Sequence, residues 1–118
     1  MTTLQYLSLV LMASLYLLAG MGHFWKPDFF LKITPKWVPQ PERVNLLVGF
    51  IEIALGIGVL IPSIRSIAAW GIMALLIAVF PANVYHFQKA RRKGAFVGPT
   101  LVRLPLQALL IYWAYTFT

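Results

Sequence analysis

A few side chains capable of chemistry lie inside long apolar stretches of this sequence. Glu52 is the only carboxylate in the apolar run from 44 to 61. A carboxylate at membrane depth costs about 2.5–3.5 kcal/mol even on a lenient insertion scale, so it must be protonated, paired or hydrated. Arg103, near the start of the last apolar run, is the cation expected to pair with it. The other candidates for this polar site are His23, Asn83, Gln107, Tyr16 and His86.

The segment VFPANVYHF closes the third apolar run and brings a proline and polar residues into it. Pro81 leaves the carbonyl four residues earlier without its usual donor, and it is expected to bend the helix there. The bend would steer Asn83 and His86 inward. Asn83 is then expected to donate a hydrogen bond to Glu52 and to accept one from Arg103.

This cluster has two interpretations. A paired glutamate with amide partners can hold helices in register, or it can form a site that handles a ligand or a proton. Each histidine fits a hydrogen-bond network better than a ligand role, and Glu52 with two histidines lacks a recognised metal-binding spacing. We therefore predict no metal site and no evident cofactor, and bound quinone or lipid stays open.

The composition favours a membrane protein. Of 118 residues, 60% are hydrophobic and 11% charged, whereas a soluble domain is about one quarter charged. So small a soluble domain could not bury this much apolar surface, so the surplus is expected to face lipid. There is no cysteine, which excludes disulfides and thiol chemistry. The net charge of +7 does not indicate nucleic-acid binding, because the basic residues are confined to segments between apolar runs.

The sequence predicts one all-α transmembrane domain covering residues 1–118. Backbone polar groups in lipid must pair internally, and the apolar runs are long without strict alternation, so they are expected to be helices rather than strands. Each is close to the ~20 residues that a spanning helix needs. The predicted spans are 4–24, 44–61, 67–87 and 97–117.

The distribution of basic residues predicts the orientation. The first and third loops, with the start of the last span, hold nine of the ten basic residues, and the second loop holds Arg65. Basic loops stay on the cytoplasmic side, so loops one and three are expected in the cytoplasm and both termini outside. The nine residues are Lys26, Lys32, Lys36, Arg43, Lys89, Arg91, Arg92, Lys93 and Arg103.

The first loop mixes aromatic residues, lysines and prolines. Aromatic rings and lysines settle at the headgroup layer, while the prolines prevent a long helix. We predict a short interfacial helix around Asp28 to Lys32, acting as an anchor or as a lid over a cavity. Small residues such as Gly20, Gly49 and Gly56 share helix faces with the polar residues and allow close helix packing.

Several of these motifs occur together in one known family. AGMGHF ends the first run, Gly49, Glu52 and Gly56 share the second, FPAN closes the third, and Arg103 and Gln107 open the fourth. Over nearly the whole chain this pattern resembles the DoxX-like family of small membrane proteins. The resemblance implies an antiparallel four-helix transmembrane bundle, mostly bacterial. It also implies a polar core of His23, Glu52, Asn83, Arg103 and Gln107.

Members of that family include the small membrane subunit of thiosulfate:quinone oxidoreductase and proteins that accompany redox enzymes. The resemblance therefore suggests an accessory or anchoring subunit linked to redox or quinone metabolism in the bacterial inner membrane. The alternative is a binder of, or an enzyme for, a small lipophilic molecule such as a quinone or isoprenoid, with Glu52 as acid or base. A proton-coupled small transporter is a third hypothesis. The partners considered are membrane lipids, a redox enzyme and a second copy of the chain, and enzyme activity is left open.

Overall fold

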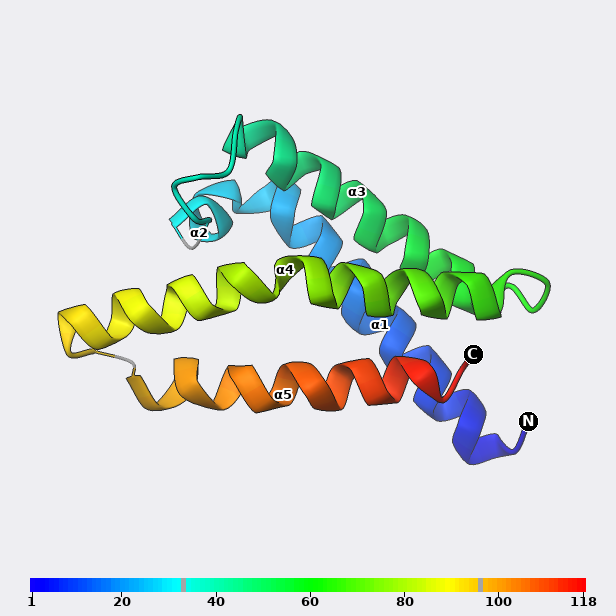
Figure 1. The fold of residues 1–118 in the computed structure, drawn as a ribbon. Helices are drawn as coiled ribbons and strands as arrows, with labels where there is room; N and C mark the ends of the chain where they lie inside the picture. Colours follow the sequence, from blue (N-terminus) through cyan, green and yellow to red (C-terminus); the bar gives the residue numbers. More distant parts are fainter. Residues whose placement is uncertain (33, 96) are drawn as a thin grey trace.

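The computed structural model describes residues 1–32, 34–95 and 97–118, and within them it contains helices and no strand. The all-α prediction is therefore confirmed. Figure 1 shows the helices in chain order: α1 (Thr3–Trp25), α2 (Pro27–Lys32), α3 (Pro41–Leu60), α4 (Arg65–Lys93) and α5 (Val97–Tyr115). The short helix predicted in the first loop is present as α2. The third apolar run forms a longer helix than predicted, because α4 continues through the basic segment to Lys93.

Local sequence signals set the helix ends. Thr2 and Gln5 form a capping box at the start of α1, in which each side chain accepts a hydrogen bond from the other residue's backbone N–H. Pro41 occupies the first turn of α3, where its missing N–H costs nothing. Gly94 ends α4 with a φ of 67°, a left-handed conformation that favours glycine.

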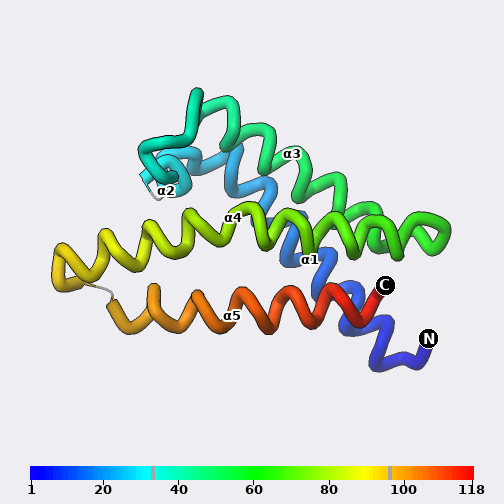
Figure 2. The backbone as a smooth tube through the Cα atoms, in the orientation of Figure 1, coloured from blue at the N-terminus to red at the C-terminus, as the bar shows by residue number. Residues whose placement is uncertain are grey.

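The helices pack in two pairs that are joined through α3 and α4. α1 packs against α3, α3 against α4, and α4 against α5, while the short α2 contacts α1 and α3. Figure 2 shows α4 and α5 side by side and running in opposite directions, with α3 inclined to them. The termini and the α3–α4 turn lie at one end of the molecule, and α2 and the α4–α5 connection lie at the other.

Hydrogen bonds agree with this placement of the ends. At the first end, the Arg65 guanidinium contacts the Met1 sulfur at 3.3 Å, and the Ser66 hydroxyl donates to the Thr118 carbonyl at 3.2 Å. At the second end, the Lys89 ammonium donates to the α2 carbonyl of Lys32 at 3.1 Å. The basic residues of the first and third loops therefore gather at the end opposite the termini.

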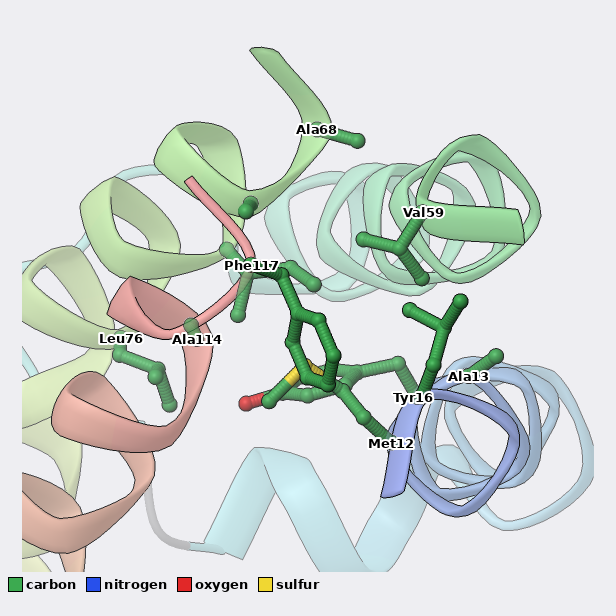
Figure 3. Close-up of a cluster of buried hydrophobic side chains, with 11 residues drawn as sticks. Met12, Ala13, Tyr16, Val59, Ala68, Leu76, Ala114 and Phe117 are labelled. Atoms are coloured by element: carbon green, nitrogen blue, oxygen red, sulfur yellow. The ribbon is translucent and has the colours of Figure 1, made fainter. Parts of the chain in front are cut away.

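The apolar core lies nearer the end that carries the termini. Met12, Val59, Ile72 and Ala114 are fully buried, and they bring side chains of all four long helices together. Figure 3 shows a close-up of this cluster. Trp113 on α5 also donates its indole N–H to a serine hydroxyl on α1 at 2.8 Å.

Glycines allow α1 and α3 to touch backbone to backbone. A Cβ added to Gly20 would lie 2.6 Å from Ile53 Cγ1 and 2.7 Å from the Gly49 carbonyl oxygen. A Cβ added to Gly49 would lie 2.7 Å from His23 Cβ. This confirms the expectation that small residues permit a close approach here.

Among the residues that the structure describes, three helices are long and apolar enough to cross a membrane: α1, α3 and α4. Most of their length faces outward, since only 22–33% of the apolar windows is buried inside the molecule. An apolar, unburied surface of this kind is what lipid would cover. α5 is not among the three, because its first half, VGPTLVRLPLQ, contains glycine, prolines, threonine, arginine and glutamine.

Candidate functional site

A cavity of about 490 Å³ lies between the two helix pairs, and its lining includes Phe30 of α2. Its walls come from all five helices and from the segment that follows α2. Most of the lining is aliphatic or aromatic, and Pro81 contributes to it. The polar side chains that line it are Tyr16, His23, Thr34, Asn45, Glu52, Asn83, Arg103 and Gln107.

His23, near the end of α1, is fixed by Asn45 on α3. Asn45 Nδ2 donates to the His23 carbonyl oxygen at 3.0 Å, which turns its Oδ1 toward the imidazole, 2.6 Å from Nδ1. Both residues are buried. Because Asn45 Oδ1 can only accept, His23 Nδ1 must carry a hydrogen, and Nε2 is the ring atom that faces the cavity carboxylate.

That carboxylate is Glu52. His23 Nε2 lies 3.5 Å from Glu52 Oε2, and both side chains are largely buried. At this distance the two groups form an ion pair when the imidazole is protonated, but no hydrogen bond reaches Oε2. The ion pair lowers the cost of placing an acidic residue in an apolar environment.

The predicted Glu52–Arg103 ion pair is wrong. Among the residues that the structure describes, Glu52 pairs with His23, and Arg103 Nη1 instead lies 3.2 Å from His86 Nδ1. The reason is lateral packing: Gly20 and Gly49 bring α1 against α3, whereas α5 packs along α4. Arg103 still lines the cavity, but His86 does not.

The predicted role of Asn83 as a bridge between Glu52 and Arg103 is also wrong. Asn83 Nδ2 donates to Gln107 Oε1 at 2.5 Å, and Gln107 Nε2 donates to the Leu76 carbonyl. That carbonyl lies in the turn of α4 before Pro81, one residue before Ile77, whose carbonyl is the one that the proline leaves without a helical donor. The amides therefore tie α5 to α4 at the proline.

α2 closes one side of the site. The Phe30 ring stacks on the His23 imidazole, with ring centroids 3.7 Å apart and planes inclined by 20°. Phe29 meets Phe30 edge to face at 5.2 Å. This contact places α2 over the cavity as well as at the end of the molecule, which supports the lid interpretation.

Two buried polar atoms of the described residues have no hydrogen-bond partner: the Tyr16 hydroxyl and Glu52 Oε2. Figure 3 shows the Tyr16 hydroxyl pointing from α1 toward the α4 and α5 side. An unsatisfied buried polar atom usually costs about 1–3 kcal/mol, so a group that forms hydrogen bonds with these two atoms would gain free energy.

Sequence reasoning found six of the polar residues that line the cavity and missed Asn45 and Thr34. Asn45 lies seven residues before Glu52, two helical turns away on the same face, and this spacing could have identified it. The stacking of Phe30 on His23 had no such signal, because it depends on how the chain turns after α1.

Comparison with known proteins places the chain in one family. It belongs to the family described as Domain of unknown function (DUF8561), whose model matches residues 12–118. That range includes every polar residue of the cavity. No curated protein and no solved structure matches the chain.

Proposed function

We propose that this protein is an integral membrane protein that binds a small lipophilic molecule in the cavity between its helix pairs. The observation that carries the proposal is the cavity itself: about 490 Å³, lined mostly by apolar side chains, with a few convergent polar groups. Ligand sites typically have this size and composition. Quinones and isoprenoids, which combine a long apolar part with a small polar head, are the ligand classes we propose.

In this proposal α5 is the fourth span of an antiparallel four-helix transmembrane bundle. The Arg103 and Gln107 side chains of α5 contact α4 or line the cavity, so they need not face lipid in spite of the lower hydropathy of this helix. The positive-inside rule supports placing the basic end, with α2, in the cytoplasm and both termini outside. The membrane proposed is the bacterial inner membrane.

The test is purification in a mild detergent, followed by mass spectrometry of the lipids that remain bound. We expect a defined lipophilic species at a stoichiometric level, and its loss or reduction in Glu52→Gln. Ser66→Ala, an exposed change at the opposite end, serves as the matched control. A wild-type protein that carries only bulk phospholipid would contradict the proposal.

The second candidate is an accessory or anchoring subunit of a redox enzyme, as the resemblance to the DoxX-like family suggests. Exposed aromatic side chains at the basic end favour it: Trp25 and Trp37 are each 72% exposed and Phe29 is 52% exposed. These side chains could contact a peripheral partner as well as lipid headgroups. The same purification tests this candidate, because a stable partner protein would appear beside the chain.

A further inference from the structure

The polar groups of the cavity divide into those already paired and those that are not. On the α4 and α5 side, Asn83 and Gln107 pair with each other and with the Leu76 carbonyl. On the α1 and α3 side, His23 is held by Asn45 and Glu52. The Tyr16 hydroxyl and Glu52 Oε2 are left without a hydrogen-bond partner, although Tyr16 is 4% exposed and the Glu52 side chain 12%.

The unpaired atoms have complementary chemistry. A carboxylate oxygen accepts hydrogen bonds, and the Tyr16 hydroxyl can donate one. Both residues line the same cavity and belong to the packed α1–α3 pair. A ligand atom that both donates and accepts would therefore satisfy the two of them together.

The rest of the lining is apolar on both sides of these atoms. Leu15 and Val48 belong to the α1–α3 side, and Leu75, Val79 and Leu110 to the α4–α5 side. A ligand head placed at Tyr16 and Glu52 would leave its apolar tail against these side chains. The surroundings thus favour a neutral amphiphile over a polar solute.

We propose that the cavity selects neutral lipophilic alcohols, with the ligand hydroxyl donating to Glu52 Oε2 and accepting from the Tyr16 hydroxyl. This inference rests on the proposed function and narrows its ligand classes to molecules that carry a hydroxyl, such as isoprenoid alcohols, so that an oxidised quinone is not the favoured ligand. An ether or ketone can accept from Tyr16 but leaves the Glu52 oxygen unpaired. A ligand carboxylate would place a second acidic group next to Glu52. The two negative charges would then repel each other unless one of the groups took up a proton.

The test compares three probes with the same tail: farnesol, its methyl ether and farnesoic acid. Binding to the full-length protein in mild detergent is measured by equilibrium dialysis of radiolabelled probe at neutral pH. We expect farnesol to bind roughly tenfold more tightly than the ether, because the ether leaves a buried acceptor unsatisfied. Farnesoic acid is expected to bind more weakly than farnesol.

Two variants test which protein group accepts from the ligand hydroxyl and which donates to it. Tyr16→Phe should weaken farnesol and its ether by a similar factor, leaving their ratio unchanged, because Tyr16 donates to both. Glu52→Gln should reduce the ratio, because an amide oxygen accepts more weakly than a carboxylate. Ser66→Ala should bind all three probes as the wild type does.

The outcomes separate the ligand class from the binding function. If the ether binds as tightly as farnesol, or if farnesoic acid binds most tightly, the alcohol inference is wrong while lipophilic binding stands. If none of the three probes binds, both proposals fail. Should Glu52→Gln not fold, the ratio of the farnesol affinity to the ether affinity still tests the alcohol inference. This ratio can be measured in the wild type and in Tyr16→Phe.

Discussion

His23 and Asn45 hold each other through reciprocal contacts between α1 and α3. The asparagine amide donates to the His23 backbone at 3.0 Å and accepts at 2.6 Å from the imidazole that faces Glu52 on its other side. Asn45 thus fixes the ring orientation, and His23 in turn offsets the burial of the acid.

Replacing Asn45 with leucine should therefore destabilise the protein. The change keeps the volume but leaves the imidazole Nδ1–H without its partner, and we expect a loss of about 1–2 kcal/mol in the free energy of unfolding. SDS titration in mixed micelles, followed by circular dichroism, measures it. Leu47→Ala, at a side chain that is 57% exposed, is the control and should change stability much less. Equal effects in both variants would contradict the role given to Asn45.

Gly20 is predicted to tolerate no side chain. In Gly20→Ala the new methyl would lie within 2.7 Å of the Gly49 carbonyl and closer still to Ile53, so α1 and α3 must separate. Overpacking of this kind costs about 1–3 kcal/mol. Gly98→Ala is the matched control, because nothing lies within 4 Å of the added atom. Both variants are compared by thermal unfolding in detergent, and a stability for Gly20→Ala equal to that of Gly98→Ala would refute the close helix contact.

The amide contact between Asn83 and Gln107 can be measured by a double-mutant cycle. We expect a coupling free energy of about 0.6 kcal/mol, and at most about 1.7 kcal/mol, as found for hydrogen bonds between membrane helices. The variants are Asn83→Ala, Gln107→Ala and the double substitution. A second cycle between Asn83→Ala and Glu52→Gln should give a coupling near zero, since Asn83 forms its hydrogen bond with Gln107 and Glu52 pairs with His23. Coupling between Asn83 and Glu52 without coupling between Asn83 and Gln107 would instead support the predicted role of Asn83 as a partner of Glu52.

The sequence identified most of the polar residues of the cavity but predicted their partners poorly. It assigned Glu52, Asn83 and Gln107 to one polar site, and the structure gathers them around one cavity. Polar residues inside apolar runs can be recognised directly in the sequence. Which helices are lateral neighbours cannot be recognised in the same way.

The pairing of Glu52 shows what was missing. Arg103 was the natural partner by charge, but α5 packs on α4 while the glycines of α1 and α3 bring His23 to the carboxylate. The small-residue face and the polar residues were each recognised in the sequence. The sequence did not show that the glycines determine which side chain pairs with Glu52. That relationship became visible only from the packing of α1 against α3.

Tyr16→Phe should make the ligand-free protein more stable. The substitution removes a buried hydroxyl that has no hydrogen-bond partner and keeps the ring that packs in the core. We expect a gain of about 1 kcal/mol, because an unsatisfied buried polar group is costly. Thermal unfolding of delipidated protein provides the measurement. A loss of stability would show that the hydroxyl is already satisfied and would weaken its assignment as a ligand contact.

The absence of cysteine makes the membrane orientation directly testable. Single cysteines at Thr2, Thr118, Lys36 and Lys93 report both ends of the molecule in an otherwise thiol-free chain. In intact cells a membrane-impermeant maleimide should label the two terminal positions and not the two basic-loop positions, because basic loops are retained in the cytoplasm. All four should react after the membrane is permeabilised, which controls for buried thiols. Labelling of Lys36→Cys and Lys93→Cys in intact cells would show the opposite orientation. Labelling of only one terminus would indicate an odd number of spans, with α5 outside the membrane.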